Sequence, residues 1–520
     1  MNATEVSLPG GSSGLALIDP VAEQIVGSHY ALSHYCAGLM ILARRLGEDR
    51  YMRQADSCLK YIEATHAEYA KKNDYHYDFN NFAWALLLLI NSKETGFLSD
   101  QVKSRLYNLL MNTPDSGHAT VNWLPMRALN NFVRHLHTGE KRYHKMAKML
   151  LEKVAAAQNR DGMYDDLLPV GKSANIQYHV YTTAVLKLIR HFKLDNGGGS
   201  LENALAFTAG MIDPEGDFNY FGRGANQIFG WGPFFFNLEG LDVPRSIYDS
   251  SIDFFSKNLS DCLNNNGLLL SNSQPDQNNY WWDYHYTTVY AAHLFLWLNL
   301  VCTIVPERYY LKKVSNTSNL ELISAETVYC AVFKGKSHYL CERGPQICNL
   351  WIKSRGSLFK GPLGPFFDDF GNKHISKAMV LMNYFGPVIE YPANFMRNNV
   401  SGPVLKVLQK MKLYNKTDAD YGMFLKPVFP EELKTGMPEA DTIEIEYRLR
   451  PPKHPVGINI PLFPGACLNG TDEFIDSEVN GKNVKLFHLG SACGTYGKFE
   501  IFRSAPQPNV RNIKLRFSLK

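Results

Sequence analysis

Hydrophobic and polar positions follow a repeating pattern along the first 300 residues. A cluster of polar and aromatic residues is followed each time by an apolar run, and the clusters begin near Ser28, His76, Asn122, Tyr178, Asn226 and Tyr284. More charged amphipathic stretches, such as residues 51–72 and 141–159, lie between the apolar runs. A period of roughly 50 residues with two helical patterns per period is typical of an α-hairpin repeat.

The alternation of apolar and amphipathic helices predicts an inner ring of helices inside an outer ring. About six such hairpins would close into an (α/α) toroid, and the polar-aromatic starts of the inner helices would gather around one central cleft. An open solenoid is the alternative, although its repeats are usually more alike and its binding surface less aromatic. We therefore expect a toroidal catalytic domain over residues 21–305, after a flexible N-terminal tail over the Gly- and Ser-rich residues 1–20.

The pattern changes after Pro306. Short alternating runs, for example residues 327–333, 442–449 and 498–502, are punctuated by Pro and Gly and predict antiparallel strands. We expect a linker over residues 306–320 and an antiparallel β-sandwich over residues 321–520. The predicted fold class is therefore multi-domain, α then β, which fits a chain of 520 residues better than one simple core.

Composition narrows the classes of function. The chain has 54 basic and 50 acidic residues, so nothing calls for a nucleic-acid or membrane-surface partner. Its apolar runs are too short to span a bilayer. Nine Cys residues without a Cys-x-x-Cys pair argue against a disulfide framework or a zinc site, and no spacing demands a metal or other cofactor. The 28 Tyr and 7 Trp residues permit stacking on sugar rings.

Cysteine usage weakly fits a reducing compartment, and the N-terminus also bears on the compartment. The N-terminus lacks the basic start and apolar core of a signal peptide. We expect a cytoplasmic protein if this N-terminus is native, and otherwise a secreted or periplasmic one.

The stretch 162–188 concentrates groups that can transfer protons. Gln177, Tyr178 and His179 stand at the start of an apolar helical run. Tyr has a pKa near 10 when unperturbed, so it needs a nearby positive charge to act as a base. The alternative is a buried Tyr and His whose hydrogen bonds are satisfied within the protein.

A second cluster contains Asn122 and Arg127. An amide and a guanidinium are donors suited to binding a carboxylate. The alternative is an Asn that caps a helix and an Arg that lies on the surface.

A third cluster, residues 217–232, is rich in Gly and polar residues. Tyr220 and Arg223 stand three positions apart, close enough for the Arg to lower the pKa of the Tyr. Packing alone does not explain so many polar and flexible residues in one short loop. We therefore expect its other polar and aromatic members to bind substrate: Asn226, Gln227 and Trp231.

The aromatic stretch 280–286 is a fourth candidate. It includes Trp282 and His285 and is suited to stacking against sugar rings. The alternative is a rim that packs against the β domain.

These clusters, together with the predicted architecture, resemble the polysaccharide lyases that join an α/α toroid to a β-sandwich. The heparinase II/III-like, alginate lyase and chondroitin/hyaluronate lyase families are among them. The residues similar to motifs of these families are Asn122-Trp123, Asp161-Gly162, Asp165, Asp166, Ser173, Tyr178-His179 and the pair Tyr220 and Arg223. The resemblance implies that Tyr178 transfers the proton and that Asn122 neutralises a uronate carboxylate. The resemblance extends to two variants of these families, so Tyr178 and Tyr220 are both candidates for the residue that transfers the proton.

The predicted function is β-elimination on an acidic, uronate-containing polysaccharide or oligosaccharide. Tyr178 or Tyr220 with His179 would supply acid–base chemistry, and Asn122 and Arg223, with His179 or Gln227, would neutralise the carboxylate. One alternative is a glycoside hydrolase on the same toroid, which needs two carboxylates from Asp165, Asp166, Asp217 and Asp283. The other is a non-catalytic carbohydrate-binding protein.

Overall fold

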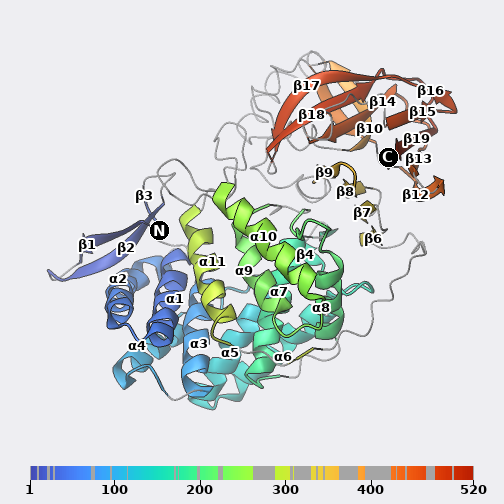
Figure 1. Ribbon diagram of the computed structural model, residues 1–520. Helices are drawn as coiled ribbons and strands as arrows, with labels where there is room; N and C mark the ends of the chain where they lie inside the picture. Colours follow the sequence, from blue (N-terminus) through green and yellow to red (C-terminus); the bar gives the residue numbers. More distant parts are fainter. Residues whose placement is uncertain are drawn as a thin grey trace. The chain divides into compact units, whose positions relative to one another are not determined.

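The computed structural model forms two compact units (Figure 1). The first comprises residues 1–219, 227–273 and 284–314, and the second comprises residues 220–226, 274–283 and 315–520. The structure describes residues 2–8, 11–19, 24–26, 30–71, 76–93, 96–113, 115–168, 171–173, 175–195, 200–220, 226–261, 287–304, 308–309, 330–334, 338–343, 346–361, 385–392, 423–428, 430–439, 442–463, 475–494 and 497–518.

The first unit is rich in helices, as the sequence predicts. Its helices are α1 (Ala31–Leu46), α2 (Asp49–Lys71), α3 (Tyr77–Lys93), α4 (Asp100–Asn112), α5 (Trp123–Thr138), α6 (Lys141–Ala156), α7 (Ile176–His191), α8 (Ser200–Gly210), the 3-10 turn η1 (Ile228–Gly230), α9 (Trp231–Leu238), α10 (Arg245–Asp261) and α11 (Thr287–Val301). A short hairpin of β4 (Asp166–Leu168) and β5 (Gly171–Ser173) lies between α6 and α7.

Six of these helices form a closed ring. Each of α1, α3, α5, α7 and α9 packs against the next, and α11 packs against α1. We call these six the ring helices. The ring helix α3 is apolar on all sides and buries every residue from Asn81 to Asn91, as expected for an interior helix. The helix α4 buries only Leu106, Leu109 and Leu110, one stripe that faces the ring.

The intervening helices pack on the outside of the ring. The helices α2, α4, α6 and α8 each contact the ring helix that precedes them. The helix α10 packs on α9, where the rings of Trp231 and Phe255 lie 5.3 Å apart. Among the described residues of the first unit after α11, which are 302–304 and 308–309, no further helix follows. The sixth hairpin therefore stays a prediction, and the linker expected at 306–320 lies almost entirely outside the described residues.

The N-terminal segment differs from the expected flexible tail. The strands β1 (Asn2–Ser7) and β2 (Ser13–Asp19) form an antiparallel hairpin, and β3 (Gln24–Ile25) pairs with β2. The physical reason is burial, because Ala16 and Leu17 have no exposed surface. The hydroxyl of Thr288 on α11 donates to the carbonyl of Ile18 at 2.9 Å, which ties β2 to the ring.

The second unit consists of antiparallel sheets, as predicted. A four-stranded sheet has the order β6 (Cys330–Lys334), β7 (His338–Arg343), β8 (Gln346–Ile352), β9 (Gly356–Lys360). One five-stranded sheet has the order β11 (Met423–Pro427), β10 (Gly386–Pro392), β14 (Val456–Leu462), β18 (Gly497–Ser504), β17 (Leu486–Gly494). The other has the order β12 (Glu432–Glu439), β13 (Thr442–Arg448), β19 (Asn512–Ser518), β15 (Ile475–Val479), β16 (Lys482–Asn483).

Alternation along the strands builds the core of this unit. In β13, Ile443 and Ile445 are buried, whereas Glu444 between them pairs across the sheet with Arg516 of β19. Buried residues of all three sheets join one hydrophobic cluster. Antiparallel strands are therefore confirmed, and their face-to-face packing as a β-sandwich stays a prediction.

Candidate functional site

The first residues of the ring helices lie at one end of the ring, which we call its N-terminal end. The ring of Tyr30, which precedes α1, lies 5.9 Å from that of His76, which precedes α3. His76 in turn lies 6.1 Å from Trp123, the first residue of α5. Phe229 of η1 and Tyr290 near the start of α11 lie 5.4 Å apart. The polar-aromatic clusters of the sequence therefore converge, as the repeat predicts.

The starts of α7 and α9 belong to the same end. The hydroxyl of Thr182 on α7 donates to the carbonyl of Val121, just before α5, at 3.3 Å. A Cβ atom on Gly230 would lie 3.2 Å from Cγ of Gln177, so η1 passes close against the start of α7. Gly at position 230 permits this approach.

Three buried amides at the N-terminal end have polar atoms without a protein partner. Among the described residues, Oδ1 of Asn122, Oε1 of Gln177 and both amide atoms of Gln227 accept or donate no hydrogen bond. A buried polar group left unsatisfied costs about 1–3 kcal/mol. These three predicted binding residues therefore have hydrogen-bonding capacity that a polar ligand or water would use. Tyr178, next to Gln177, is half-buried.

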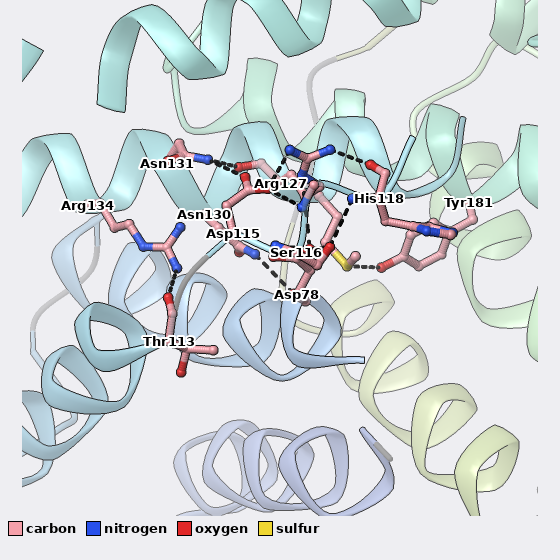
Figure 2. Close-up of polar contacts among 12 residues, drawn as sticks. Asp78, Thr113, Asp115, Ser116, His118, Arg127, Asn130, Asn131, Arg134 and Tyr181 are labelled. Carbon is pink, nitrogen blue, oxygen red and sulfur yellow. Dashed lines mark hydrogen bonds and ion pairs between the residues drawn. The ribbon is translucent and has the colours of Figure 1, made fainter. Parts of the chain in front are cut away.

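A buried ionic network lies between α3 and α5 at the same end (Figure 2). One oxygen of Asp78, in the first turn of α3, accepts the backbone N–H of Ser116 at 3.3 Å and also its hydroxyl. Arg127 of α5 forms an ion pair with Asp115 and donates to the carbonyl of His118. Its Nε atom lies 4.0 Å from the same Asp78 oxygen.

This network shifts the pKa of its acids and bases. Burial raises the pKa of Asp78 to about 6, and the negative charge of Asp115 acts in the same direction. The hydrogen bond from Ser116 and the positive charge of Arg127 oppose that shift. Burial, with a contribution from Arg127, lowers the pKa of His118.

Asp78 was not among the predicted site residues. Its only signal in the sequence is its place in the second polar-aromatic cluster, after His76 and Tyr77. Its position beside a second carboxylate arises from the loop before α5, which local sequence cannot reveal.

Arg127, a predicted binding residue, is already engaged within the protein. Its side chain is buried and its guanidinium is already paired with Asp115 and the His118 carbonyl. These contacts favour a structural role, although the Nε atom has no hydrogen-bond partner among the described residues, and the binding role stays a prediction.

His179 and Trp231 also point into packing contacts. The Nδ1 atom of His179 accepts the backbone N–H of Tyr164 at 3.1 Å, and its Nε2 lies 3.1 Å from the hydroxyl of Thr208 on α8. Burial lowers the pKa of His179 to about 3. Trp231 has no exposed surface and lies among Phe218, Phe234, Phe235, Phe254 and Phe255. These contacts favour the structural alternative for both residues.

The remaining predicted residues are only partly described. Tyr220 is fully buried, and Asn226 is buried with a left-handed backbone, φ 56°. Both belong to the second unit, so they remain predictions for this site. Arg223, Trp282 and His285 lie outside the described residues.

The described carboxylates of the hydrolase alternative make local contacts within the protein. Asp217 accepts the backbone N–H of Asn219 at 2.8 Å in a local turn. Asp165 is buried, 3.4 Å from the amide nitrogen of Asn159. Asp283 lies outside the described residues, as does the side chain of Asp166.

A cavity of about 540 Å³ lies elsewhere, between α3, α4 and the end of α5. Its lining includes Lys103, Tyr107 and His137, and the rings of the last two stack 3.8 Å apart. None of the predicted site residues lines this cavity. In the part of the chain that the structure describes, no group of three or more His, Cys, Asp or Glu residues is placed to hold a metal ion. No described helix is long and apolar enough to cross a membrane.

Comparisons with known proteins do not assign a family. No family model and no curated protein matches the sequence. Among solved structures, an α-1,6-mannanase from Salegentibacter sp. HEL1_6 is 14% identical, with 52% of this chain and 89% of that chain covered and a TM-score of 0.37. A family 88 glycosyl hydrolase from Bacteroides vulgatus is 13% identical, with 54% of this chain and 93% of that chain covered and a TM-score of 0.38. A polysaccharide lyase is 15% identical, with 53% of this chain and 91% of that chain covered and a TM-score of 0.36. Similarities at this level leave the activity to be argued from the site itself.

Proposed function

We propose that the ring is an (α/α) toroid of a carbohydrate-active enzyme that cleaves a uronate-containing glycan by β-elimination. The observation that supports this best is the set of buried amides with unused hydrogen-bonding capacity at the start of three successive ring elements. Asn122, Gln177 and Gln227 stand at the N-terminal end of the ring, as does the half-buried Tyr178.

The amides suit the recognition of a carboxylate. Rotation of a terminal amide exchanges its oxygen and nitrogen, so Asn122 and Gln227 can each present N–H donors to a bound carboxylate. Donors aimed at the carboxylate stabilise the charge that develops when the adjacent C5–H bond breaks, and one such donor contributes about 3 kcal/mol. Arg223 remains a predicted additional donor.

Tyr178 is the proposed acid–base residue. It takes the proton from C5, the C4–O4 bond breaks, and the electron pair of the C5–H bond forms the C4=C5 double bond. The departing O4 then receives a proton from the Tyr178 hydroxyl. We leave His179 out of the proposed step because both of its ring nitrogens contact groups within the protein.

Hydrolysis is the second candidate, and Asp78 favours it. A buried carboxylic acid with a pKa raised to about 6 has the property of a general acid near neutral pH. Asp115, on the other side of Arg127, would be the second carboxylate that a glycosidase requires.

The two reactions leave different products. Incubation with a panel of uronate polymers is followed by ultraviolet absorbance and by reducing-end release. Rising absorbance with new reducing ends supports elimination, because only elimination conjugates a double bond to the carboxylate. New reducing ends without absorbance support the hydrolase, and binding without either product supports a non-catalytic carbohydrate-binding protein.

A further inference from the structure

The loop between α4 and α5, residues 115–122, is held by its own hydrogen bonds. Asp115 accepts the backbone N–H of Gly117 at 2.9 Å, and the Ser116 hydroxyl oxygen accepts that of His118 at 3.1 Å. The backbone N–H of Trp123 donates to the carbonyl of Thr120 at 2.9 Å, where the loop enters α5. We call this segment the α4–α5 loop.

Side chains of the ring helices α3 and α5 also bind the loop. Asp78 of α3 accepts two hydrogen bonds from Ser116. From α5, Arg127 pairs with Asp115, and the amide of Asn131 donates to the other oxygen of Asp115 at 3.2 Å. Figure 2 shows these contacts meeting at the beginning of the loop.

The far part of the loop carries groups of the candidate site. The ring of His118 packs edge-to-face on Trp123, with ring centroids 4.6 Å apart. Asn122, one of the amides with an unused oxygen, directly precedes Trp123. Any change that loosens the beginning of the loop therefore alters the placement of His118 and Asn122.

We propose that Asp78 is a positioning residue. Its carboxylate accepts the two hydrogen bonds from Ser116, a contact that we call the latch, and so fixes the α4–α5 loop that presents His118 and Asn122. The latch is a property of the fold, whereas its effect on substrate rests on the proposed function.

The charge on Asp78 sets the strength of the latch. Hydrogen bonds to an ionised carboxylate are roughly twice as strong as those between neutral groups. Asp115 of the loop faces Asp78 with a negative charge, and Arg127 and Arg134 of α5 face it with positive charges. Because the pKa of Asp78 is raised to about 6, the latch is ionised at neutral pH and weakens on mild acidification.

Hydrogen exchange of the full-length chain tests the latch directly. The variants are Asp78→Asn, which keeps the shape and removes the charge, and Ser116→Ala, which removes the hydroxyl that donates to Asp78 and with it the acceptor of the His118 N–H. The matched control is Asp100→Asn, an acid on α4 whose side chain is 97% exposed and pairs with Lys103. Peptides that cover residues 115–122 are followed, with exchange corrected for the intrinsic effect of pH.

The latch predicts about tenfold faster exchange of the loop in Asp78→Asn and Ser116→Ala, as expected when a charge-assisted hydrogen bond is lost. The control should behave like the wild type. Wild-type exchange should also accelerate between about pH 7 and about pH 5, whereas Asp78→Asn should show no such change. Unchanged exchange in Asp78→Asn, or equal acceleration in the control, would overturn the latch.

Turnover separates the positioning role from the proposed function. If the wild type eliminates a uronate polymer, Asp78→Asn should raise KM by about tenfold or more, change kcat less, and flatten the acid side of the pH profile. Unchanged KM and pH profile in Asp78→Asn would overturn the positioning role. If the wild type shows no elimination while the loop loosens as predicted, the lyase proposal fails and the latch stands.

Discussion

The Nε2 atom of His179 lies 3.1 Å from the hydroxyl oxygen of Thr208. Thr208 donates its own hydroxyl proton to the carbonyl of Ala204, so His179 is the donor in this pair. The other ring nitrogen of His179 accepts the backbone N–H of Tyr164. A neutral imidazole therefore joins α7 to α8 and to the segment after α6, which is a structural role.

Replacing His179 with Ala should destabilise the protein by about 2–4 kcal/mol, because a cavity forms and the Tyr164 N–H loses its acceptor. Urea unfolding measures the change. The folded fraction should keep its turnover number, since His179 contacts no reacting atom in this account. Wild-type stability together with a hundredfold loss of kcat would restore His179 to the catalytic role that the sequence suggests.

Three buried histidines should make the free energy of unfolding fall with acid. Burial lowers the pKa of His34 and His179 to about 3 and that of His293 well below its usual value. The unfolded state then binds more protons below pH 6.5, so the stability that each contributes is lost as the pH falls. His34 and His179 should each cost about 2 kcal/mol between about pH 7 and about pH 5, and His293 should act in the same direction. Asp78, whose pKa is raised, should instead stabilise the folded state by about 1 kcal/mol as the pH falls over the same interval.

His293→Phe separates this effect from general acid sensitivity. His293 stacks 4.0 Å from Phe229, and neither of its ring nitrogens has a hydrogen-bond partner among the described residues. A phenyl ring should therefore fit and flatten the pH dependence of unfolding over the same range. An unchanged pH dependence would show that His293 does not titrate in this way.

Lys187 should contribute strongly to stability. Its buried ammonium on α7 donates to the carbonyls of Phe236 and Asn237 at 2.7 and 3.1 Å, and also to that of Glu239, at the end of α9. Lys187→Met would leave buried carbonyls without a donor and should cost about 3 kcal/mol. Lys148→Met is the control, because that surface pair with Asp195 should contribute about 1 kcal/mol or less. Equal thermal unfolding of the two variants would contradict this.

Gly162 is required by its backbone and its neighbour. Its φ is 97°, and a Cβ atom there would collide with the backbone carbonyl of Asn203. Gly162→Ala should therefore destabilise by about 3 kcal/mol or more. Gly139→Ala is the matched control, since its φ is 72° and no atom lies within 4 Å of the added Cβ. That variant should cost about 1 kcal/mol, so denaturant unfolding of the pair isolates the collision.

Sequence periodicity predicted the ring helices and the strands because burial repeats along each element. It could not assign the faces of single residues at a helix start. Successive helical positions differ by about 100°, so Gln177, Tyr178 and His179 point in different directions although all stand at the N-terminal end of the ring. The amides of Asn122 and Gln227 have atoms without a hydrogen-bond partner among the described residues, and their binding role stays a prediction. Asp78 was missed because its neighbour Ser116 comes from a distant loop.

The most direct test of β-elimination by Tyr178 is ultraviolet absorbance of wild-type, Tyr178→Phe and Tyr143→Phe proteins with uronate polymers. Tyr143 is a half-buried tyrosine on the outer helix α6 and serves as the matched control. We predict rising absorbance with the wild type and the control, and a rate of absorbance increase at least about a hundredfold lower with Tyr178→Phe. Elimination at the wild-type rate in Tyr178→Phe would contradict this prediction.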